Sequence, residues 1–375
     1  MATILAGTSY FDLFSTPRTD RYDRVQRSRM LTGRRVWGPL QALSLRTSGR
    51  GFDLLHSFNM IPLGVAPYIV SFEGELPRAM DGAGRSAMRR LLRGRLLSER
   101  CRGLYPISRF ATRLFARACA DWPLLDRALA RCQVVYPNVP LRRSAPRRAA
   151  SGTLRLVFIG NEWARKGGAA CARMLPLLRQ KRIPFTLDVV SGLAHGERVY
   201  TDTGADFYAR DLGRLDAGEV RVHGPMRNAD VLRLIEASDL CLLPTLDDSF
   251  GFSLLESMSC AVPVIATAVC AIPEIVDDGA DGVLLPLPTD GDGRWRHVYA
   301  PRDERLSPRH RSLLDTTLDG LARGLAGAIE RLLDRELDYE RLSQGAIDKV
   351  RSRFEMGRQA ERWHAIYRAC IGPSG

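Results

Sequence analysis

The segment from residue 240 to residue 286 constrains the fold more than any other part of the chain. It opens with an uninterrupted apolar run, Leu240–Leu243, which is typical of a parallel strand that is covered on both faces. Turn residues follow, and a helix is expected to begin directly after Gly251, at Phe252 or Ser253. A second apolar run, Val262–Thr267, indicates a second strand. This order of strand, turn, helix and strand predicts an α/β core with a parallel sheet.

The start of that helix is a candidate phosphate-binding turn. Gly251 lets the backbone approach a ligand closely, and the amides and dipole of a helix start favour an anion. In a doubly wound sheet this point lies at the carboxyl edge of the strands. Asp248 precedes the helix and Glu256 lies about one turn inside it, close enough to accept hydrogen bonds from a ribose. The residues alone leave open the alternative of an ordinary strand-turn-helix unit.

A second candidate phosphate site follows the apolar run Leu154–Ile159. Its loop begins with Gly160 and Asn161 and ends with two cations, Arg165 and Lys166, ahead of two further glycines. Arginine and lysine are the usual side chains that clamp phosphate, so the loop suits a pyrophosphate. A basic pair after a strand is also common in α/β proteins, and that interpretation is the alternative.

Together the two segments resemble a known family. The run Asp-Ser-Phe-Gly-Phe-Ser-Leu-Leu-Glu, followed by Val-Pro-Val-Ile-Ala-Thr and Ile-Pro-Glu-Ile-Val-Asp-Asp-Gly, is similar to the donor-binding segment of family 4 glycosyltransferases. The pattern Gly-x-x-x-x-x-Lys-Gly from residue 160 resembles the phosphate loop of the same enzymes. The resemblance implies the α/β GT-B fold, in which two Rossmann-like domains with parallel sheets face a central cleft. It also implies a retaining, metal-independent glycosyltransferase that moves a sugar from a UDP- or GDP-sugar to a glycan, glycolipid or other acceptor.

The resemblance assigns roles to individual residues. Lys166 and Arg165 would stabilise the pyrophosphate leaving group, Glu256 would hold the ribose, and Asp248 would contact the donor sugar. The other residues expected at the donor are Gly160, Asn161, Gly224, Phe250, Gly251, Phe252, Ser253 and Leu254. The nucleotide-sugar is a co-substrate, and neither a cofactor nor a metal is expected. A bacterial polysaccharide or glycolipid is the expected product.

Several positions depart from the family pattern. Asn161 stands where the family often has arginine, and Asp248 is one methylene shorter than the usual glutamate. Ala261 replaces a common glycine at a helix end, which costs roughly 1 kcal/mol if the backbone there is left-handed. Cys270 begins a pair that replaces two glycines. With Glu73, these departures keep open the alternative of a catalytically degenerate subunit that binds a donor without turnover.

The first half of the chain also alternates between expected strands and helices. Apolar runs at residues 3–6, 52–58 and 67–72 predict parallel strands. His56 is expected at the end of the second strand, and Glu73 at the end of the third. In the family comparison, the strand that ends in Glu73 resembles one whose end often carries a histidine near the reacting sugar. Either Glu73 or His56 is therefore the candidate catalytic group of this half.

Composition predicts the domain organisation. The 375 residues are enough for two α/β domains, and Val139–Gly152 is rich in proline, arginine, alanine and serine, as linkers are. We expect a basic N-terminal acceptor-side domain over residues 1–150, with its linker at about residues 139–152. A donor domain should occupy residues 153–345, and a terminal helix over residues 346–375 should return to the first domain, as in GT-B enzymes.

The positive charge is concentrated in the first half. Residues 1–150 contain 26 arginines and 10 acidic residues, a net charge of +16, whereas the remainder has a net charge of −3. Such a field suits an anionic partner, and Arg85–Arg102, with apolar residues at helical spacing among arginines, predicts a peripheral contact with an anionic membrane or a lipid-linked acceptor. A packed helix with a solvated basic face is the alternative. A basic two-domain protein that binds nucleic acid through residues 1–150 is an alternative function, but the absence of aromatic residues interleaved with the basic segments counts against it.

Neither a long apolar run of about 18 residues nor a signal-peptide pattern is found, so we expect a cytoplasmic protein, with peripheral attachment to the inner face of the membrane as an extension.

The eight cysteines form no C-x-x-C pair, which argues against a zinc site or a disulfide framework. His223 is interpreted as structural, and Gly224 as a turn that borders a nucleobase. The polar insertion at residues 286–308 contains an Asp-x-Asp spacing, but no metal is expected there.

Overall fold

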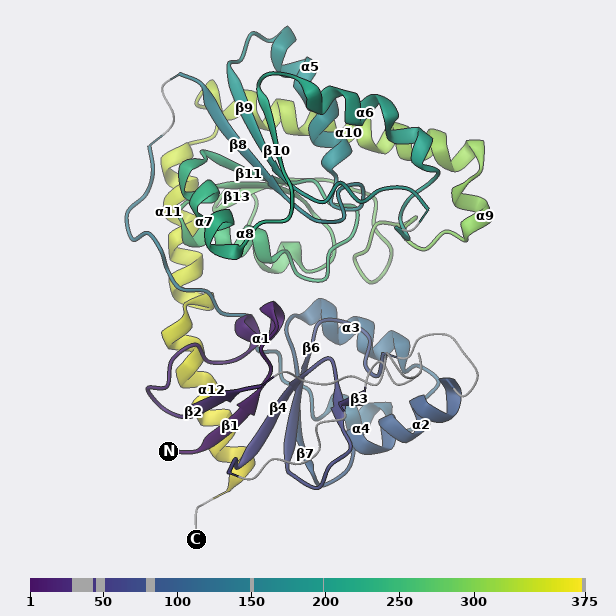
Figure 1. Ribbon diagram of the computed structural model, residues 1–375, viewed down its shortest axis with the longest axis vertical. Helices are drawn as coiled ribbons and strands as arrows, with labels where there is room; N and C mark the ends of the chain where they lie inside the picture. Colours follow the sequence, from purple (N-terminus) through teal and green to yellow (C-terminus); the bar gives the residue numbers. More distant parts are fainter. Residues whose placement is uncertain (29–42, 45–50, 79–84, 149–151, 198, 373–375) are drawn as a thin grey trace. The chain divides into compact units, whose positions relative to one another are not determined.

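The computed structural model describes residues 1–28, 43–44, 51–78, 85–148, 152–197 and 199–372. The chain forms two compact units, of which the first comprises Met1–Pro140 with Ser352–Gly375 and the second Leu141–Arg351. Each unit is an α/β unit with a parallel sheet, as the sequence predicted (Figure 1).

The first unit contains a five-stranded parallel sheet in the order β2-β1-β4-β6-β7. Its strands are β1 (Thr3–Ala6), β2 (Arg24–Arg27), β4 (Leu54–Phe58), β6 (Tyr68–Phe72) and β7 (Cys101–Pro106), with a short pair of β3 (Leu43–Ser44) and β5 (Ile61–Pro62). Its helices are α1 (Tyr10–Ser15), α2 (Arg85–Leu96), α3 (Arg109–Ala118), α4 (Leu125–Leu129) and α12 (Met356–Ile371). The C-terminal helix α12 packs through Trp363 and Tyr367 against Ile4, Leu54 and Ile69 of the sheet.

The second unit contains a six-stranded parallel sheet in the order β10-β9-β8-β11-β12-β13. Its strands are β8 (Leu154–Ile159), β9 (Phe185–Val190), β10 (Val220–His223), β11 (Leu240–Leu243), β12 (Val264–Thr267) and β13 (Gly282–Leu285). Its helices are α5 (Gly168–Gln180), α6 (Ala209–Gly213), α7 (Asn228–Ala237), α8 (Phe252–Ser259), α9 (Arg302–Arg305), α10 (Pro308–Leu333) and α11 (Tyr339–Lys349). One hydrophobic core lies between the sheet and helices α5 and α10 (Figure 1).

The boundary between the units lies earlier than the composition predicted. The backbone N–H groups of Arg142 and Arg143 donate to the carbonyl oxygen of Ser259 at 2.9 and 3.1 Å, and Arg147 N–H donates to Ser343 Oγ at 2.8 Å. These hydrogen bonds attach the segment after Pro140 to the second unit, although its composition is that of a linker. The chain returns to the first unit at Ser352, after the end of α11.

Two departures from the family pattern have left-handed backbones. The φ angle of Ala261, just after α8, is +59°, and that of Cys270 is +57°. A left-handed conformation brings the Cβ of a non-glycine residue close to the following carbonyl oxygen and costs roughly 1–2 kcal/mol. Alanine at position 261 therefore does occupy the left-handed backbone conformation that makes it costly relative to glycine.

We expect the Ala261→Gly variant to be more stable than the wild type by roughly 1 kcal/mol, because glycine removes the strain but adds entropy to the unfolded chain. The measurement is the free energy of unfolding in urea. Ala266→Gly is the matched control, because Ala266 is equally buried but lies in β12 without a positive φ angle. This control should be destabilised by about 0.5–1 kcal/mol. An equal loss of stability in both variants would contradict the strain at Ala261.

Candidate functional site

The central contact of the second unit joins Lys166 to Asp248. Lys166 lies in the loop after β8, and Asp248 in the turn after the neighbouring strand β11, so both lie at the carboxyl edge of the sheet. Lys166 Nζ forms an ion pair with Asp248 Oδ2, and the two side chains are only 17% and 7% exposed. Burial acts to raise the pKa of Asp248, but the charges of Lys166 and Arg165 outweigh it and lower that pKa below its ordinary value. Asp248 is therefore a carboxylate at neutral pH.

Two glycines allow this contact. Gly167 has a φ angle of +81°, and a Cβ atom at this position would lie 1.9 Å from the carbonyl oxygen of Pro244. A Cβ atom on Gly160, at the end of β8, would lie 2.9 Å from the Lys166 side chain. Only glycine at residue 167 thus lets the loop after β8 touch the end of β11, which is what brings Lys166 to Asp248.

Arg165 supports the turn after β11. Its Nη1 donates to the carbonyl oxygen of Asp247 at 2.5 Å, its Nε pairs with Glu162, and its guanidinium carbon lies 5.6 Å from the centre of the Tyr200 ring. Asn161, at the start of the same loop, is exposed, and its carbonyl oxygen accepts from Ala194 N–H at 3.4 Å. Arg165, the other cation of the loop, therefore already has bonding partners within the second unit.

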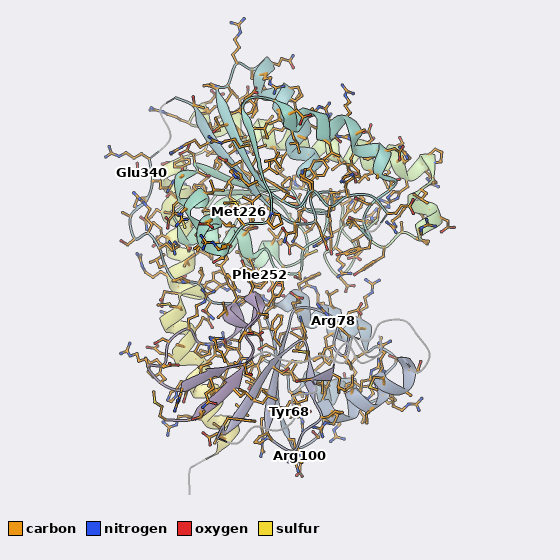
Figure 2. All side chains as sticks on the ribbon, in the orientation of Figure 1. Tyr68, Arg78, Arg100, Met226, Phe252 and Glu340 are labelled. Atoms are coloured by element: carbon orange, nitrogen blue, oxygen red, sulfur yellow. The ribbon has the colours of Figure 1, made fainter. Side chains whose placement is uncertain are left out.

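Helix α8 begins at Phe252, as the sequence predicted, and Figure 2 labels this residue. The preceding Gly251 has a φ angle of +95°, and its carbonyl oxygen accepts from Leu254 N–H at 3.0 Å. The rings of Phe250 and Phe252 lie 5.2 Å apart, and Phe250, Phe252 and Leu254 are buried, whereas Ser253 is half-buried. The first turn is thereby anchored on apolar contacts at the carboxyl edge, next to Asp248.

A residue of helix α7 orients the side chain of Glu256. Its side chain is buried, and its Oε1 accepts from Asn228 Nδ2 at 2.7 Å. Asn228 is the first residue of α7, and the short segment between it and β10 contains Gly224, which is exposed. The structure thus connects Glu256 and the segment after β10 through one hydrogen bond.

A second buried carboxylate, Asp247, was missed by the sequence analysis. Cys270 Sγ donates to Asp247 Oδ1 at 3.2 Å, Tyr200 OH donates to Oδ2, and Arg294 Nε lies 3.6 Å from Oδ1. Burial and then Asp247 raise the pKa of the Tyr200 phenol, which therefore stays a donor. Arg294 comes from the insertion at residues 286–308, whose sequence suggested no contact with this turn. In the sequence, the signal that could have pointed to Asp247 was its position directly before Asp248.

Asp202 holds the loop that carries Tyr200. Its Oδ1 accepts from Tyr208 OH at 2.5 Å and its Oδ2 from Gly196 N–H at 2.8 Å. Burial raises the pKa of Asp202 to about 7. Because this value lies above the ordinary value of about 3.9 expected in the unfolded chain, the folded state binds the proton more tightly.

We therefore expect the contribution of Asp202 to stability to be largest below about pH 4 and to fall as pH rises through about 7. The Asp202→Asn variant, which cannot ionise there, should lose less stability than the wild type over this interval. The measurement is the free energy of unfolding at several pH values. Asp216→Asn, at an exposed position, is the control and should follow the wild type. Parallel curves for the wild type and Asp202→Asn would contradict the shifted pKa.

In the first unit, Glu73 directly follows β6, at the carboxyl end where it was predicted. The residue is buried, and its Oε1 accepts from Arg78 Nη2 at 3.0 Å and from Asn59 Nδ2 at 3.2 Å. Its backbone N–H donates to Asn59 Oδ1 at 3.1 Å. The Glu73 side chain is therefore held in one orientation at a strand end.

The placement of His56 at a strand end was wrong. Strand β4 continues to Phe58, so that His56 lies in its middle and is only 1% exposed. Its two ring nitrogens bond to Tyr367 OH at 2.8 Å and to Ser71 Oγ at 2.7 Å. Burial, and then the charge of Arg27, lower its pKa to about 3. His56 is a neutral histidine of the core between the sheet and α12, and it has no free nitrogen for catalysis.

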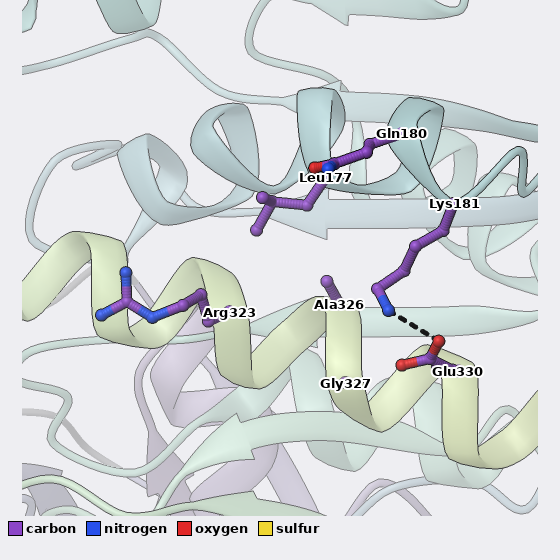
Figure 3. A pocket seen from close by; sticks show the side chains of 7 residues that line it. All are labelled: Leu177, Gln180, Lys181, Arg323, Ala326, Gly327 and Glu330. Atoms are coloured by element: carbon purple, nitrogen blue, oxygen red, sulfur yellow. Dashed lines mark hydrogen bonds and ion pairs between the residues drawn. The ribbon is translucent and has the colours of Figure 1, made fainter.

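A groove elsewhere on the second unit contains none of the predicted residues. It lies between α5 and α10, has a volume of about 480 Å³, and is crossed by an ion pair of 2.6 Å between Lys181 and Glu330 (Figure 3). Among the described residues, no group of three or more His, Cys, Asp or Glu side chains could hold a metal ion. No helix in the described part of the chain is long and apolar enough to cross a membrane.

Residues 153–292 match the family model described as glycosyl transferases group 1, and this segment contains Lys166, Asp248 and Glu256. The D-inositol 3-phosphate glycosyltransferase of Thermobifida fusca is 27% identical over 335 residues, which cover 79% of this chain and 74% of that protein. The enzyme of the same name from Mycobacterium bovis is 31% identical over 165 residues, or 42% of this chain and 33% of that protein. These findings support a glycosyltransferase of the group 1 type. Such an enzyme transfers a sugar to an acceptor.

Similarity to solved structures shows that this chain has the GT-B fold. Sucrose-phosphate synthase from Thermosynechococcus elongatus has a TM-score of 0.59 at 15% identity, with 98% of each chain covered. A glycosyltransferase from Rickettsia africae has a TM-score of 0.57 at 14% identity and covers 86% of this chain and 78% of its own. The Anabaena protein HepE, in complex with UDP, has a TM-score of 0.55 at 13% identity and covers 98% of this chain and 99% of its own.

Proposed function

We propose that this protein is a retaining glycosyltransferase that uses a nucleotide-sugar donor, a UDP- or GDP-sugar, and needs no metal. The observation that carries the proposal is the buried Lys166–Asp248 ion pair beside the start of α8, with Glu256 on the same helix. The crystal structures of HepE with UDP, and with UDP and glucose, support a nucleotide-sugar at this fold. Retention follows from the resemblance to family 4 enzymes.

The donor pyrophosphate would replace Asp248 as the partner of Lys166. In the free protein Lys166 is neutralised by Asp248, and a diphosphate at the start of α8 offers it a stronger negative charge. The cation then stabilises the charge that develops on the leaving group, which is the work that a metal would otherwise do. Released from Lys166, Asp248 can accept hydrogen bonds from hydroxyls of the donor sugar.

Gly160, Asn161, Arg165 and the first turn of α8 would line the diphosphate, and Gly224 would border the base. Glu256 would accept hydrogen bonds from the ribose, since a carboxylate accepts but cannot donate. Glu73 is our candidate for the group of the first unit that acts on the acceptor. Hydrogen bonds from Arg78 and Asn59 hold its side chain in place for such a role.

We also propose that helix α2 contacts a lipid-linked acceptor or an anionic membrane surface. Arg89, Arg90, Arg93, Asp121 and Trp122 are among the residues that line a cavity of about 370 Å³ beside this helix, and Asp121 pairs with Arg93 at 2.7 Å. Leu91, on the same helix, is 53% exposed, and the helix contains no acidic residue. Arginines around an exposed apolar side chain suit a negatively charged lipid surface.

The test is thermal unfolding of the purified protein with UDP, GDP and their sugars, followed by an assay for sugar transfer to glycolipid acceptors. A nucleotide at about 100 times its dissociation constant should add roughly 2.7 kcal/mol to the free energy of unfolding. If none of these nucleotides shifts the midpoint, the proposed function fails. If a donor binds but no product forms with any acceptor, the alternative of a degenerate donor-binding subunit is favoured.

A further inference from the structure

An Asp–His–Arg cluster lies at the edge strand of the second sheet and takes no part in the site described above. Asp188 of β9 is buried, and its Oδ1 accepts from His223 Nε2 at 2.7 Å. Arg221 donates from Nε to Asp188 Oδ1 at 3.0 Å and from Nη2 to Oδ2 at 3.1 Å. A carboxylate that accepts from both sides carries no proton of its own, so the ring proton of His223 must lie on Nε2.

In the neutral form of the His223 ring, the remaining nitrogen is then an acceptor. In the neutral ring, a proton on Nε2 leaves a lone pair on Nδ1. Nδ1 has no hydrogen-bond partner among the residues that the structure describes, and 29% of the side chain is exposed. A structural histidine such as His56 differs in this respect, because both of its nitrogens are bonded. The cluster therefore presents one oriented acceptor at the surface.

His223 lies at the same sheet edge and on the same sheet face as Glu256. It is the last residue of β10, so it lies at the carboxyl edge, and a Cβ atom on Gly224, the next residue, would have no neighbour within 4 Å. Leu187 and Val189 belong to the core under α5 and α10, so the side chains of Asp188 and His223 lie on the opposite face, where α7 and α8 pack together (Figure 1).

We propose that His223 reads the base of the bound nucleotide, by accepting at Nδ1 a hydrogen bond from a ring N–H group. The inference rests on the proposed nucleotide-sugar donor, with the ribose at Glu256. Asn228 ties that carboxylate to the segment that follows His223, which places a base attached to the ribose within this region.

The chemistry of the bases makes this acceptor selective. Uracil and guanine each carry a ring N–H, at N3 and N1, where cytosine and adenine have a lone pair. Facing His223 Nδ1, a lone pair would leave two acceptors opposed and desolvated, which is more costly than the loss of a hydrogen bond alone. Uridine and guanosine diphosphates are therefore the class of nucleotide that the site accepts, and UDP against CDP is the sharpest comparison because the two differ little in size.

The experiment measures dissociation constants of UDP and CDP for the full chain by calorimetry. For the wild type we expect a preference for UDP of about tenfold or more. His223→Ala should reduce that preference to about twofold, because the oriented acceptor is lost. Asp188→Asn should also reduce it, because the carboxylate that orients the ring is gone. Arg221→Gln is the control, since it retains the carboxylate and should keep most of the preference. Thermal unfolding of each variant checks that it is folded.

The outcomes separate this inference from the proposed function. If His223→Ala weakens UDP and CDP by the same factor, or changes neither, base reading by His223 is wrong while nucleotide binding stands. If guanosine nucleotides bind and uridine nucleotides do not, GDP against ADP replaces the pyrimidine pair, and an unchanged ratio in His223→Ala has the same meaning. If no nucleotide binds to the wild type, both the proposed function and this inference fall.

Discussion

Sugar transfer by the Lys166→Ala variant is expected to be at least about a hundredfold slower than transfer by the wild type, measured as kcat/KM with the preferred donor. Lys166 is the cation paired with Asp248, and both side chains are largely buried, so water cannot take over the charge that the lysine supplies. Arg165, which would also line the diphosphate, is expected to replace it only in part, because its guanidinium is bonded to Glu162 and to the carbonyl oxygen of Asp247.

Lys181→Ala is the matched control for this prediction. The chain has only three lysines, and Lys181 pairs with Glu330 at the surface, where the two side chains are 40% and 42% exposed. Exposed pairs of this kind contribute about 0–1 kcal/mol, so this variant should keep its rate and its stability. Thermal unfolding of Lys166→Ala separates a lost cation from a lost fold. A folded Lys166→Ala protein with a rate close to that of the wild type would exclude Lys166 from transition-state stabilisation.

Glu256→Ala should abolish the stabilisation of the protein by its nucleotide. In the wild type, ligand at about 100 times its dissociation constant adds roughly 2.7 kcal/mol, and we expect this gain to disappear in the variant. The physical reason is that Glu256, in the proposed site, would offer the ribose a buried, oriented carboxylate, and a carboxylate in a dry site is a stronger acceptor than a neutral group. The measurement is the shift of the thermal midpoint on addition of nucleotide.

Two variants serve as controls for Glu256. Glu236→Ala removes a more exposed glutamate of α7, which pairs with Arg142, and should respond to nucleotide like the wild type. Asn228→Ala keeps the Glu256 carboxylate but removes the Asn228 amide that donates to it, so nucleotide affinity should fall only in part. If Glu256→Ala is stabilised by nucleotide as strongly as Glu236→Ala, the ribose is not bound at Glu256.

Local patterns were sufficient wherever the physical cause is local. The apolar run Leu240–Leu243 is typical of a strand covered on both faces, and Gly251 permits the positive φ angle at which α8 begins. For the same reason the left-handed backbone at Ala261 could be stated as a condition, since the end of α8 requires it whatever packs around. The alternation of such units determined the parallel α/β architecture of both units.

The partners of the site residues were decided by tertiary structure. Lys166 and Asp248 are 82 positions apart, and they meet because Gly167 lets one loop pass the end of β11. Asp247 is bonded by Tyr200 and Arg294 from two loops on either side of it in sequence, and nothing local marks those loops as neighbours. The sequence around His56 suggested a histidine at a strand end with a free nitrogen. In the structure one of its ring nitrogens is bonded to Tyr367, which lies 311 positions later in the chain. A local sequence determines which backbone conformations are cheap, whereas burial and hydrogen-bond partners depend on which distant segments the folded chain brings together.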